Sequence, residues 1–336
     1  IYSQTSPSLS PNLPFGSVAY SDDIWSIQHN PAGLGLSRGW QWYYTHSYVD
    51  STFEGDKALF LSAGPVGFSA EWLGQQLTSK YRKYTLAHGI KFDERLFIGT
   101  SYAWFGSRNK DFDKLSSWSA GIVLRPHRYL SIGAKAIDLN RPKFQNQRID
   151  ISFNYGVAIR PLTDRITLAV DGFSTEKQSW EDIKYTYKLE TEPLEGLIFY
   201  GFLDQDRNYS LGMKINFPNF GLGSFNFFHK DKGFQNGVSY VGFSGNRYRT
   251  HLERKNNLLN LKLSGEIPEE SRSGGFSAKR KTIYQILNQI QKAKEDRTIS
   301  GLILRIESLN LGLAKVQELR DALFDLTTAD VCRKYL

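Results

Sequence analysis

A two-residue alternation between large apolar side chains and small or polar ones recurs over most of this chain and constrains its fold more than any other feature. This is the period of a β-strand with two different faces. In NYSLGMKINF, residues 208–217, Tyr209, Leu211, Met213, Ile215 and Phe217 alternate with Ser210, Gly212, Lys214 and Asn216. A single strand of this kind fits a soluble sheet as well as a membrane sheet, so the choice depends on the whole chain.

Residues 39–246 contain fourteen such segments, punctuated by Gly, Pro, Asn and Asp. Almost no helical pattern intervenes between them, so the predicted class is mainly β. The expected strands cover residues 39–50, 57–64, 66–74, 80–92, 96–106, 114–125, 129–139, 147–160, 165–174, 182–191, 196–204, 208–217, 220–230 and 234–245.

The polar faces decide between the two kinds of sheet, because they mix small residues with ionisable ones that a dry core would not accept. These residues are Glu71, Lys91, Lys135, Asp171, Lys184 and Lys214. The apolar faces must then be covered by lipid or by a second sheet. A closed transmembrane barrel of fourteen antiparallel strands, apolar outside and polar inside, meets both conditions. A soluble double sheet is the alternative.

Loop lengths and aromatic residues agree with the barrel. If the first strand runs outward, seven longer external loops alternate with six mostly shorter turns, as in outer-membrane barrels. The tryptophans near strand ends suit aromatic girdles at the two membrane interfaces, although ordinary strand aromatics would look the same: Trp40, Trp42, Trp72 and Trp104.

Composition excludes several other classes. No apolar run reaches the roughly 18 to 20 residues that a spanning helix needs. The net charge of +8 is dispersed, so we expect no nucleic-acid partner. The lone Cys332 cannot form an internal disulfide. The opening, IYSQTSPSLS, lacks an export signal, which we expect to be removed or to lie outside this sequence.

No catalytic, cofactor-binding or metal-binding residue can be assigned within this chain. The six histidines lack the spacing of metal ligands: His29, His46, His88, His127, His229 and His251. The carboxylate pairs Asp22-Asp23 and Glu269-Glu270 lie in loops without a paired base.

Residues 1–38 precede the barrel and form a separate segment. A short helical stretch is expected around Ile24–Ile27, followed by a turn at Asn30-Pro31 and Gly33. The motif HNPAGLGL, residues 29–36, resembles the start of barrels similar to the long-chain fatty-acid transporter and of barrel subunits of Bacteroidetes secretion systems. The resemblance implies that this segment plugs the lumen or lines a hydrophobic pathway.

The pattern changes after Gly245. A charged linker, residues 247–257, is followed by an alternating strand at Leu259, Leu261 and Leu263. Ser277 is expected to cap a helix, Leu302–Ile306 to form a buried strand, and residues 314–325 a second helix. The apolar positions of the two helices are Ile283, Ile286, Leu287, Ile290 and Ala293, then Val316, Leu319 and Leu323.

This order predicts an α/β unit with a parallel sheet. Because fourteen strands return the chain to the side where it entered, the unit is expected in the periplasm. Lys279-Arg280-Lys281 is expected to be a solvated face, with docking to a partner or to lipid headgroups as the alternative.

Residues 258–336, and above all 301–323, resemble the opening of a peptidase domain of the signal peptide peptidase A family. Those are serine-lysine peptidases with a fold related to Clp protease and the crotonases. The family's Ser-Pro-Gly-Gly-Gly oxyanion segment is matched here by Ser308 and Gly312, but residues 309–311 depart from it. The resemblance places the serine and lysine beyond Leu336. The final CRKYL arrives about ten residues early for the family, so we expect a fragment.

Two functional hypotheses follow. In the first, the chain is an outer-membrane barrel with a periplasmic serine peptidase domain that turns over envelope peptides and proteins. In the second, it is a non-catalytic conduit for lipids or hydrophobic ligands, or a scaffold whose degenerate peptidase domain docks other proteins. The expected partners are outer-membrane lipid and either envelope proteins or a peptide substrate.

Overall fold

The computed structural model describes residues 6–10, 13, 16–49, 55–74, 80–112, 114–161, 163–252, 257–269, 282–296 and 299–328. The chain divides into two compact units, residues 1–252 and 253–336. No helix in the described ranges combines the length and apolarity needed to cross a membrane.

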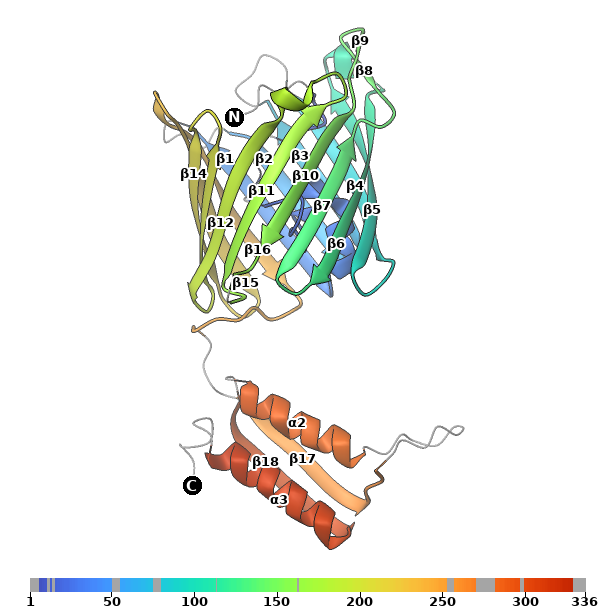
Figure 1. Cartoon of the computed structure of the whole chain (residues 1–336), viewed down its shortest axis with the longest axis vertical. Helices are drawn as coiled ribbons and strands as arrows, with labels where there is room; N and C mark the ends of the chain where they lie inside the picture. The colour runs from blue at the N-terminus through green and yellow to red at the C-terminus, as the bar shows by residue number, and fades with distance from the viewer. Residues whose placement is uncertain are drawn as a thin grey trace. The chain divides into compact units, whose positions relative to one another are not determined.

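The first unit contains a closed barrel of fourteen antiparallel strands, as the sequence predicted (Figure 1). Each strand pairs with its neighbours, and β1 pairs with β16 to close the cylinder. The strands are β1 Trp40–Tyr48, β2 Lys57–Ala63, β3 Val66–Leu73, β4 Tyr81–Lys91, β5 Leu96–Ser107, β6 Ser116–His127, β7 Leu130–Ile137, β10 Ser152–Ile159, β11 Ile166–Thr175, β12 Lys184–Leu194, β13 Leu197–Asp204, β14 Tyr209–Asn216, β15 Phe220–His229 and β16 Gly233–Ser244.

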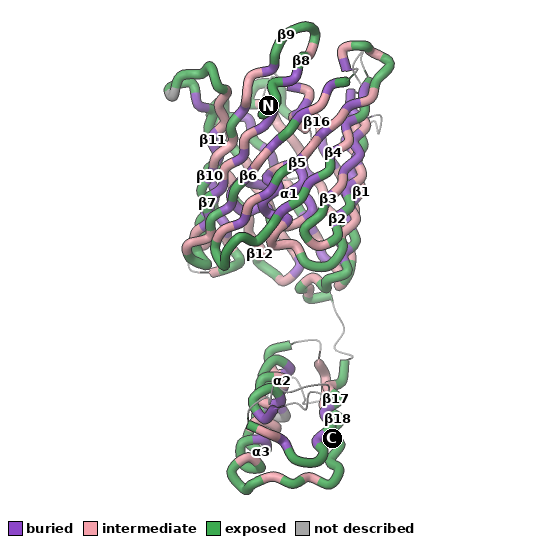
Figure 2. The backbone as a smooth tube through the Cα atoms, turned by 90° about the vertical axis from the view of Figure 1, so that its right-hand side faces the viewer, coloured by how far each residue is buried: buried purple, intermediate pink, exposed green. Residues whose placement is uncertain are grey.

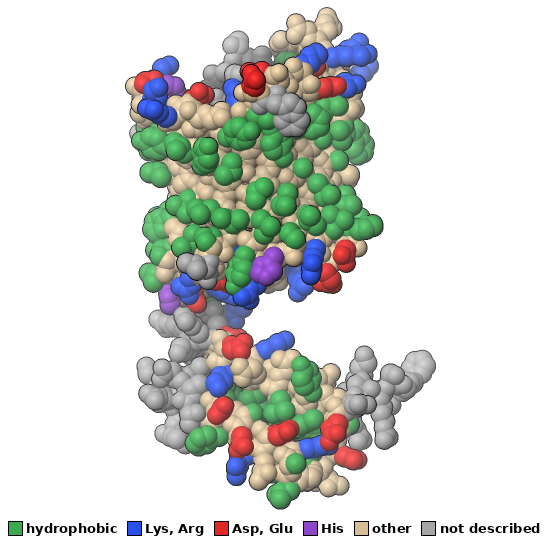
Figure 3. Space-filling model, viewed as in Figure 1, with side chains coloured by type: hydrophobic (Ala, Val, Ile, Leu, Met, Phe, Trp, Pro, Cys, Tyr) green, Lys and Arg blue, Asp and Glu red, His purple; other side chains and the backbone are tan. Residues whose placement is uncertain are grey.

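The two faces of the strands are separated as expected. On β14, Ser210 is 3% exposed and Lys214 is buried, whereas Leu211 is 55% exposed. Buried and exposed residues alternate along the other strands (Figure 2). Hydrophobic side chains cover the outer wall of the barrel, with charged ones gathered at its two ends (Figure 3). The apolar faces therefore point away from the lumen, and the alternative of two stacked sheets is wrong.

The predicted strand 147–160 begins later than expected. Residues 147–148 instead form a small hairpin, β8 Lys143–Phe144 with β9 Gln147–Arg148. The turn residues Gln145 and Asn146 have φ angles of 51° and 62°. Such left-handed pairs close two-residue hairpins, so the local turn draws this stretch away from the wall.

The predicted lumen-facing ionisable residues are found inside the barrel with one exception. Glu71, Lys135, Asp171 and Lys214 are buried, and Lys184, although exposed at the start of β12, borders a lumen cavity. Lys91 lies at the end of β4, where it is exposed and pairs with Glu94 at 2.8 Å. Its place beyond the last buried position of the strand lets the side chain reach water.

The N-terminal segment enters the lumen, as the barrel interior in Figure 1 shows. It contains α1 Ser26–His29 and a 3₁₀-helix, η1 Pro31–Leu36. The helical stretch thus starts two residues later than predicted. Between the two elements, the Asn30 side chain accepts a hydrogen bond from the Ala32 N–H, which satisfies a donor at the start of η1.

The second unit has the predicted order of strand, helix, strand and helix. It consists of β17 Asn257–Glu266, α2 Ile283–Glu295, β18 Ile299–Asn310 and α3 Leu313–Thr328, with β17 and β18 parallel. Leu261 and Leu263 pack against Ile286 and Ile290 of α2.

Three expectations for this unit need correction. Helix α2 is capped by Thr282, whose side chain accepts from the Gln285 N–H in a capping box. Ser277 lies outside the described residues, as do Lys279-Arg280-Lys281 and Cys332. Strand β18 is exposed over residues 303–308 because, in the described ranges, it pairs with β17 alone. Val316 is 41% exposed instead of packed.

Candidate functional site

The lumen of the barrel holds the N-terminal segment along its length. We call the described residues between 6 and 38 the plug, the barrel end with loops 138–151 and 176–183 the loop end, and the opposite end the turn end. Ser6 and Ser8 donate to Asp138 at the loop end. Asp22 forms an ion pair with Arg125 at the turn end. The plug therefore occupies the lumen between both ends.

A row of wall glycines seats the centre of the plug. Gly89, Gly99 and Gly121 pair in register across β4, β5 and β6. A Cβ at any of them would lie less than 3.0 Å from Asn30, Pro31 or Ala32. Gly89 and Gly99 meet the backbone of η1 and Gly121 meets the Asn30 side chain that caps it, so the three positions form a fitted seat for η1 and its cap. We call them the glycine seat.

Buried charges fix the plug on the same side of the lumen. Glu71 and Lys83 are cross-strand partners on β3 and β4, with Oε1 and Nζ 3.5 Å apart and both side chains almost fully buried. The Gln28 amide donates to Glu71 at 2.7 Å and its oxygen accepts from Lys83 at 3.0 Å. Lys83 also donates to the Ser8 carbonyl at 2.8 Å. Each charge thus has the hydrogen bonds that burial requires.

A second charged contact lies on β11 and β12. Asp171 accepts from the Ser17 hydroxyl and from the Val18 N–H, and pairs with Lys188 at 2.6 Å. Lys188 also donates to the Gly16 carbonyl. The ion pair therefore binds the plug where it passes β11 and β12.

Aromatic packing against β1, β2 and β16 also holds the plug. Trp25 is 4% exposed and lies edge-on to Tyr43, Phe60 and Tyr240, with centroid distances of 5.0, 5.0 and 5.5 Å. Ile27 packs into the same cluster. Edge-to-face contacts of this kind stabilise beyond the burial of area alone, so this cluster is a strong anchor.

A cavity of about 510 Å³ remains in the lumen beside the plug. Its apolar lining comes from Leu13 and from the wall aromatics Phe202, Phe225 and Phe227. Its polar lining includes Asp171, Lys184, Lys188 and Asp204. The cavity can therefore accept a small molecule that has an apolar body and a polar end.

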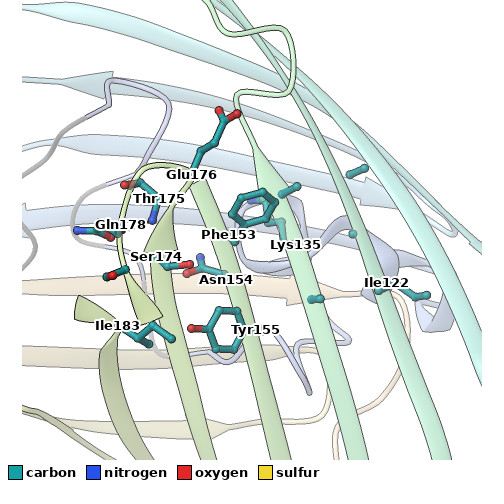
Figure 4. A pocket seen from close by; sticks show the side chains of 15 residues that line it. Ile122, Lys135, Phe153, Asn154, Tyr155, Ser174, Thr175, Glu176, Gln178 and Ile183 are labelled. Atoms are coloured by element: carbon teal, nitrogen blue, oxygen red, sulfur yellow. Dashed lines mark hydrogen bonds between the residues drawn. The ribbon is translucent and has the colours of Figure 1, made fainter. Parts of the chain in front are cut away.

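A second cavity, of about 640 Å³, lies on the lipid-facing side of the wall, beneath the loop between β11 and β12. Phe153, Tyr155, Ser174 and Ile183 line it below Thr175 and Glu176 (Figure 4). We call it the outer crevice.

The sequence predicts no metal site. Among the residues that the structure describes, His, Cys, Asp and Glu form no group of three or more that could hold a metal ion. The sequence pattern indicated neither the glycine seat nor the role of Gln28. The seat has no sequence signal, because its members are neighbours only across strands.

A closed barrel of fourteen strands with an apolar outer wall and a lumen filled by its own N-terminal segment is a plugged transmembrane β-barrel of the outer-membrane type. No protein-family model and no curated protein matches the sequence.

The backbones of several solved barrels follow a similar course. The CymD monoaromatic hydrocarbon channel aligns with a TM-score of 0.46 and 11% identity, over 70% of this chain and 95% of that one. A Pseudomonas aeruginosa FadL homologue gives 0.45 and 10%, over 71% and 99%. The deltaS2 mutant of the TodX monoaromatic hydrocarbon channel gives 0.48 and 11%, over 72% and 99%. Likenesses of this size concern the course of the backbone alone.

Proposed function

We propose that this barrel is a plugged conduit that admits small hydrophobic or amphipathic molecules across the bacterial outer membrane. The lumen cavity is the observation that carries the proposal. A porin for ions and sugars needs a continuous wet path, whereas here the plug occupies much of the lumen, with Ser6 bound to the wall at the loop end and Asp22 at the turn end. The space left beside it is bounded on one side by Phe202, Phe225 and Phe227.

The aromatic lining gives the cavity its selectivity. Contact with apolar surface stabilises a bound molecule by roughly 25 cal/mol for each Å² removed from water. Lys184 lies at the same cavity, so the polar end of an amphipathic molecule has a cationic group to meet. A solute of this kind is held in the cavity without displacing η1 from the glycine seat.

Fluorescence of N-phenyl-1-naphthylamine tests the proposal, because the probe brightens on entering an apolar site. We expect saturable binding to the purified full-length chain, and faster entry into intact cells that carry it than into cells that lack it. Phe227→Ala should weaken binding about tenfold, which corresponds to about 1.4 kcal/mol of lost contact. Phe228→Ala is the matched control, because Phe228 packs on the exposed Tyr209 of the outer wall. Absence of binding, or equal affinity in the two variants, would contradict the proposal.

The side of the membrane on which the second unit lies is also a proposal. The chain enters β1 and leaves β16 at the same barrel end, where the Gly245 N–H donates to the Trp40 carbonyl. Because the short turns of such barrels face the periplasm, we infer that residues 253–336 are periplasmic. Protease digestion of intact cells, with the second unit protected and the external loops cut, would support this.

A second candidate function is peptidase activity of the second unit. Its parallel strands and two helices support an α/β fold of the kind that the family resemblance implies. However, β18 continues past Ser308, and Leu309 and Asn310 pair with Gly265 and Glu266. Residues 309–311 also replace the proline and the first two glycines of the family's oxyanion segment, so the close backbone approach that glycine allows is lost, which favours a docking role over catalysis. Turnover of a fluorogenic peptide by the full-length protein would restore the catalytic hypothesis.

A further inference from the structure

The outer crevice is formed where the lipid-facing wall changes from large side chains to small ones. One cross-strand row runs over four strands, each residue paired with the next: Ala120, Ala136, Phe153 and Ser174. The next row runs in the same way through Ile122, Ala134, Tyr155 and Gly172. The next row toward the turn end is large throughout, and consists of Leu124, Ile132, Val157 and Val170. The small residues therefore form a depression bounded by a ledge.

The loop between β11 and β12 covers the depression. Ile183 follows the lipid-facing alternation of Tyr185 and Tyr187, yet it is only 6% exposed because it lies in the crevice. Gln178 holds the loop in shape by accepting from the Thr175 N–H at 2.9 Å and donating its own N–H to the Thr175 carbonyl at 3.0 Å.

Ion pairs tie the same loop to the neighbouring one. Glu176 pairs with Arg141, and Lys177 pairs with Asp150 at 2.7 Å. The covering loop is thus held at several points above the barrel wall.

The crevice does not lead into the lumen. Lys135 and Asn154 border both cavities, but they pair with each other across β7 and β10. The ladder runs without a register shift from Ser152 opposite Ile137 to Ile159 opposite Leu130. The pairing of β10 with β11 is equally continuous. A molecule in the crevice therefore comes from the membrane, and the wall separates it from the transported solute.

We propose that the outer crevice is a binding site for one acyl chain of a membrane lipid in the leaflet at the loop end. The apolar walls of Phe153, Tyr155 and Ile183 open onto hydrocarbon, and an empty space of this size would forfeit the dispersion contacts of its lining. The polar side chains at its loop side, Thr175, Glu176 and Gln178, lie where a lipid headgroup meets water. Because the loop covers the crevice, a lipid bound there exchanges more slowly than the other lipids that surround the barrel.

Native mass spectrometry of the full-length protein, released from detergent after extensive delipidation, tests this proposal. We expect one lipid to remain on each barrel. The double variant Ala134→Leu/Ala136→Leu fills the crevice with apolar side chains and should lower the fraction of lipid-bound barrel at least tenfold. Ala63→Leu makes the same substitution on the outer wall of β2, whose neighbours β1 and β3 contribute no residue to the crevice, and should leave the bound fraction unchanged. A heat-dependent shift in gel mobility checks that each variant is folded.

The mass of the retained molecule identifies its source. A phospholipid or a lipid A species supports the proposal, whereas a retained apolar solute that is not a lipid overturns it. The proposal also fails if the wild-type barrel retains nothing, or if the filled variant retains as much as the wild type. Phe227→Ala should leave lipid retention unchanged, so failure here is separate from failure of the conduit.

Discussion

Glu71 and Lys83 face each other across β3 and β4 inside the lumen, and Gln28 of the plug binds both. Neither charge reaches water, since the two side chains are 2% and 1% exposed. The wall and the plug therefore depend on one another: without Gln28, the pair loses hydrogen bonds that its burial requires.

Replacing Lys83 by methionine should destabilise the barrel strongly. The substitution leaves the Glu71 carboxylate buried without its cation, which costs about 3–5 kcal/mol. Denaturant unfolding in detergent measures this change. Lys91→Met is a control on the same strand, because Lys91 pairs with Glu94 at the surface, where such pairs are worth at most about 1 kcal/mol. The double change Glu71→Leu/Lys83→Met should recover much of the loss. Equal effects of the two single changes would contradict the assigned burial.

Substitution in the glycine seat should loosen the plug. A Cβ at Gly99 would overlap Pro31 and Ala32, so Gly99→Ala should shift η1 and destabilise the plugged state by about 1–3 kcal/mol. We expect the wild-type barrel to conduct ions little or not at all in a planar bilayer, and the variant to show open events.

Gly106→Ala is the matched control for this experiment. Gly106 is also on β5, but a Cβ there meets nothing within 4 Å. Its conductance should equal that of the wild type. If Gly99→Ala behaved in the same way, the glycine seat would not be what holds the plug.

Truncation of Trp25 should remove the aromatic anchor. Loss of a large buried aromatic side chain costs about 3–5 kcal/mol, because a cavity remains between the plug and the wall. The melting temperature of the detergent-solubilised protein should fall accordingly. Trp118→Ala removes the same kind of side chain from the outer wall, where it is 49% exposed, and should have a smaller effect.

In the second unit, Thr282→Ala should fray the start of α2. The substitution removes the acceptor for the Gln285 N–H and costs about 1 kcal/mol. Hydrogen exchange followed by mass spectrometry should show faster exchange in the first turn of the helix. Asn288→Ala changes an exposed position in the middle of α2 and should leave that turn protected. Unchanged exchange in Thr282→Ala would argue against the capping box.

The barrel wall could be predicted from the sequence because its signal is local. Alternation with period two identifies each strand by itself, and ionisable residues such as Glu71 and Lys135 indicate which face is inside. The β8–β9 hairpin could not be found in this way, since two-residue strands have no measurable period. In α2, the spacing of Thr282 and Gln285 is a capping-box signal that competed with Ser277.

The fit of the plug and the outer crevice could not be predicted from the sequence. Gly89, Gly99 and Gly121 become neighbours only when the barrel closes in register. Ala134 and Ala136 likewise read as ordinary lipid-facing residues. Only the β11–β12 loop, which places Ile183 over them, turns their small size into a cavity.

Site-directed spin labelling along β14 tests most directly that apolar side chains face lipid and polar ones face a closed lumen. The only cysteine is Cys332, so single cysteines can be introduced at residues 209–216 in a Cys332→Ser background. In bilayers, we expect oxygen to collide frequently with labels at Tyr209, Leu211, Met213 and Ile215, and rarely with labels at the intervening positions. High accessibility of the first set to a water-soluble nickel chelate, or the absence of a two-residue period, would contradict the account.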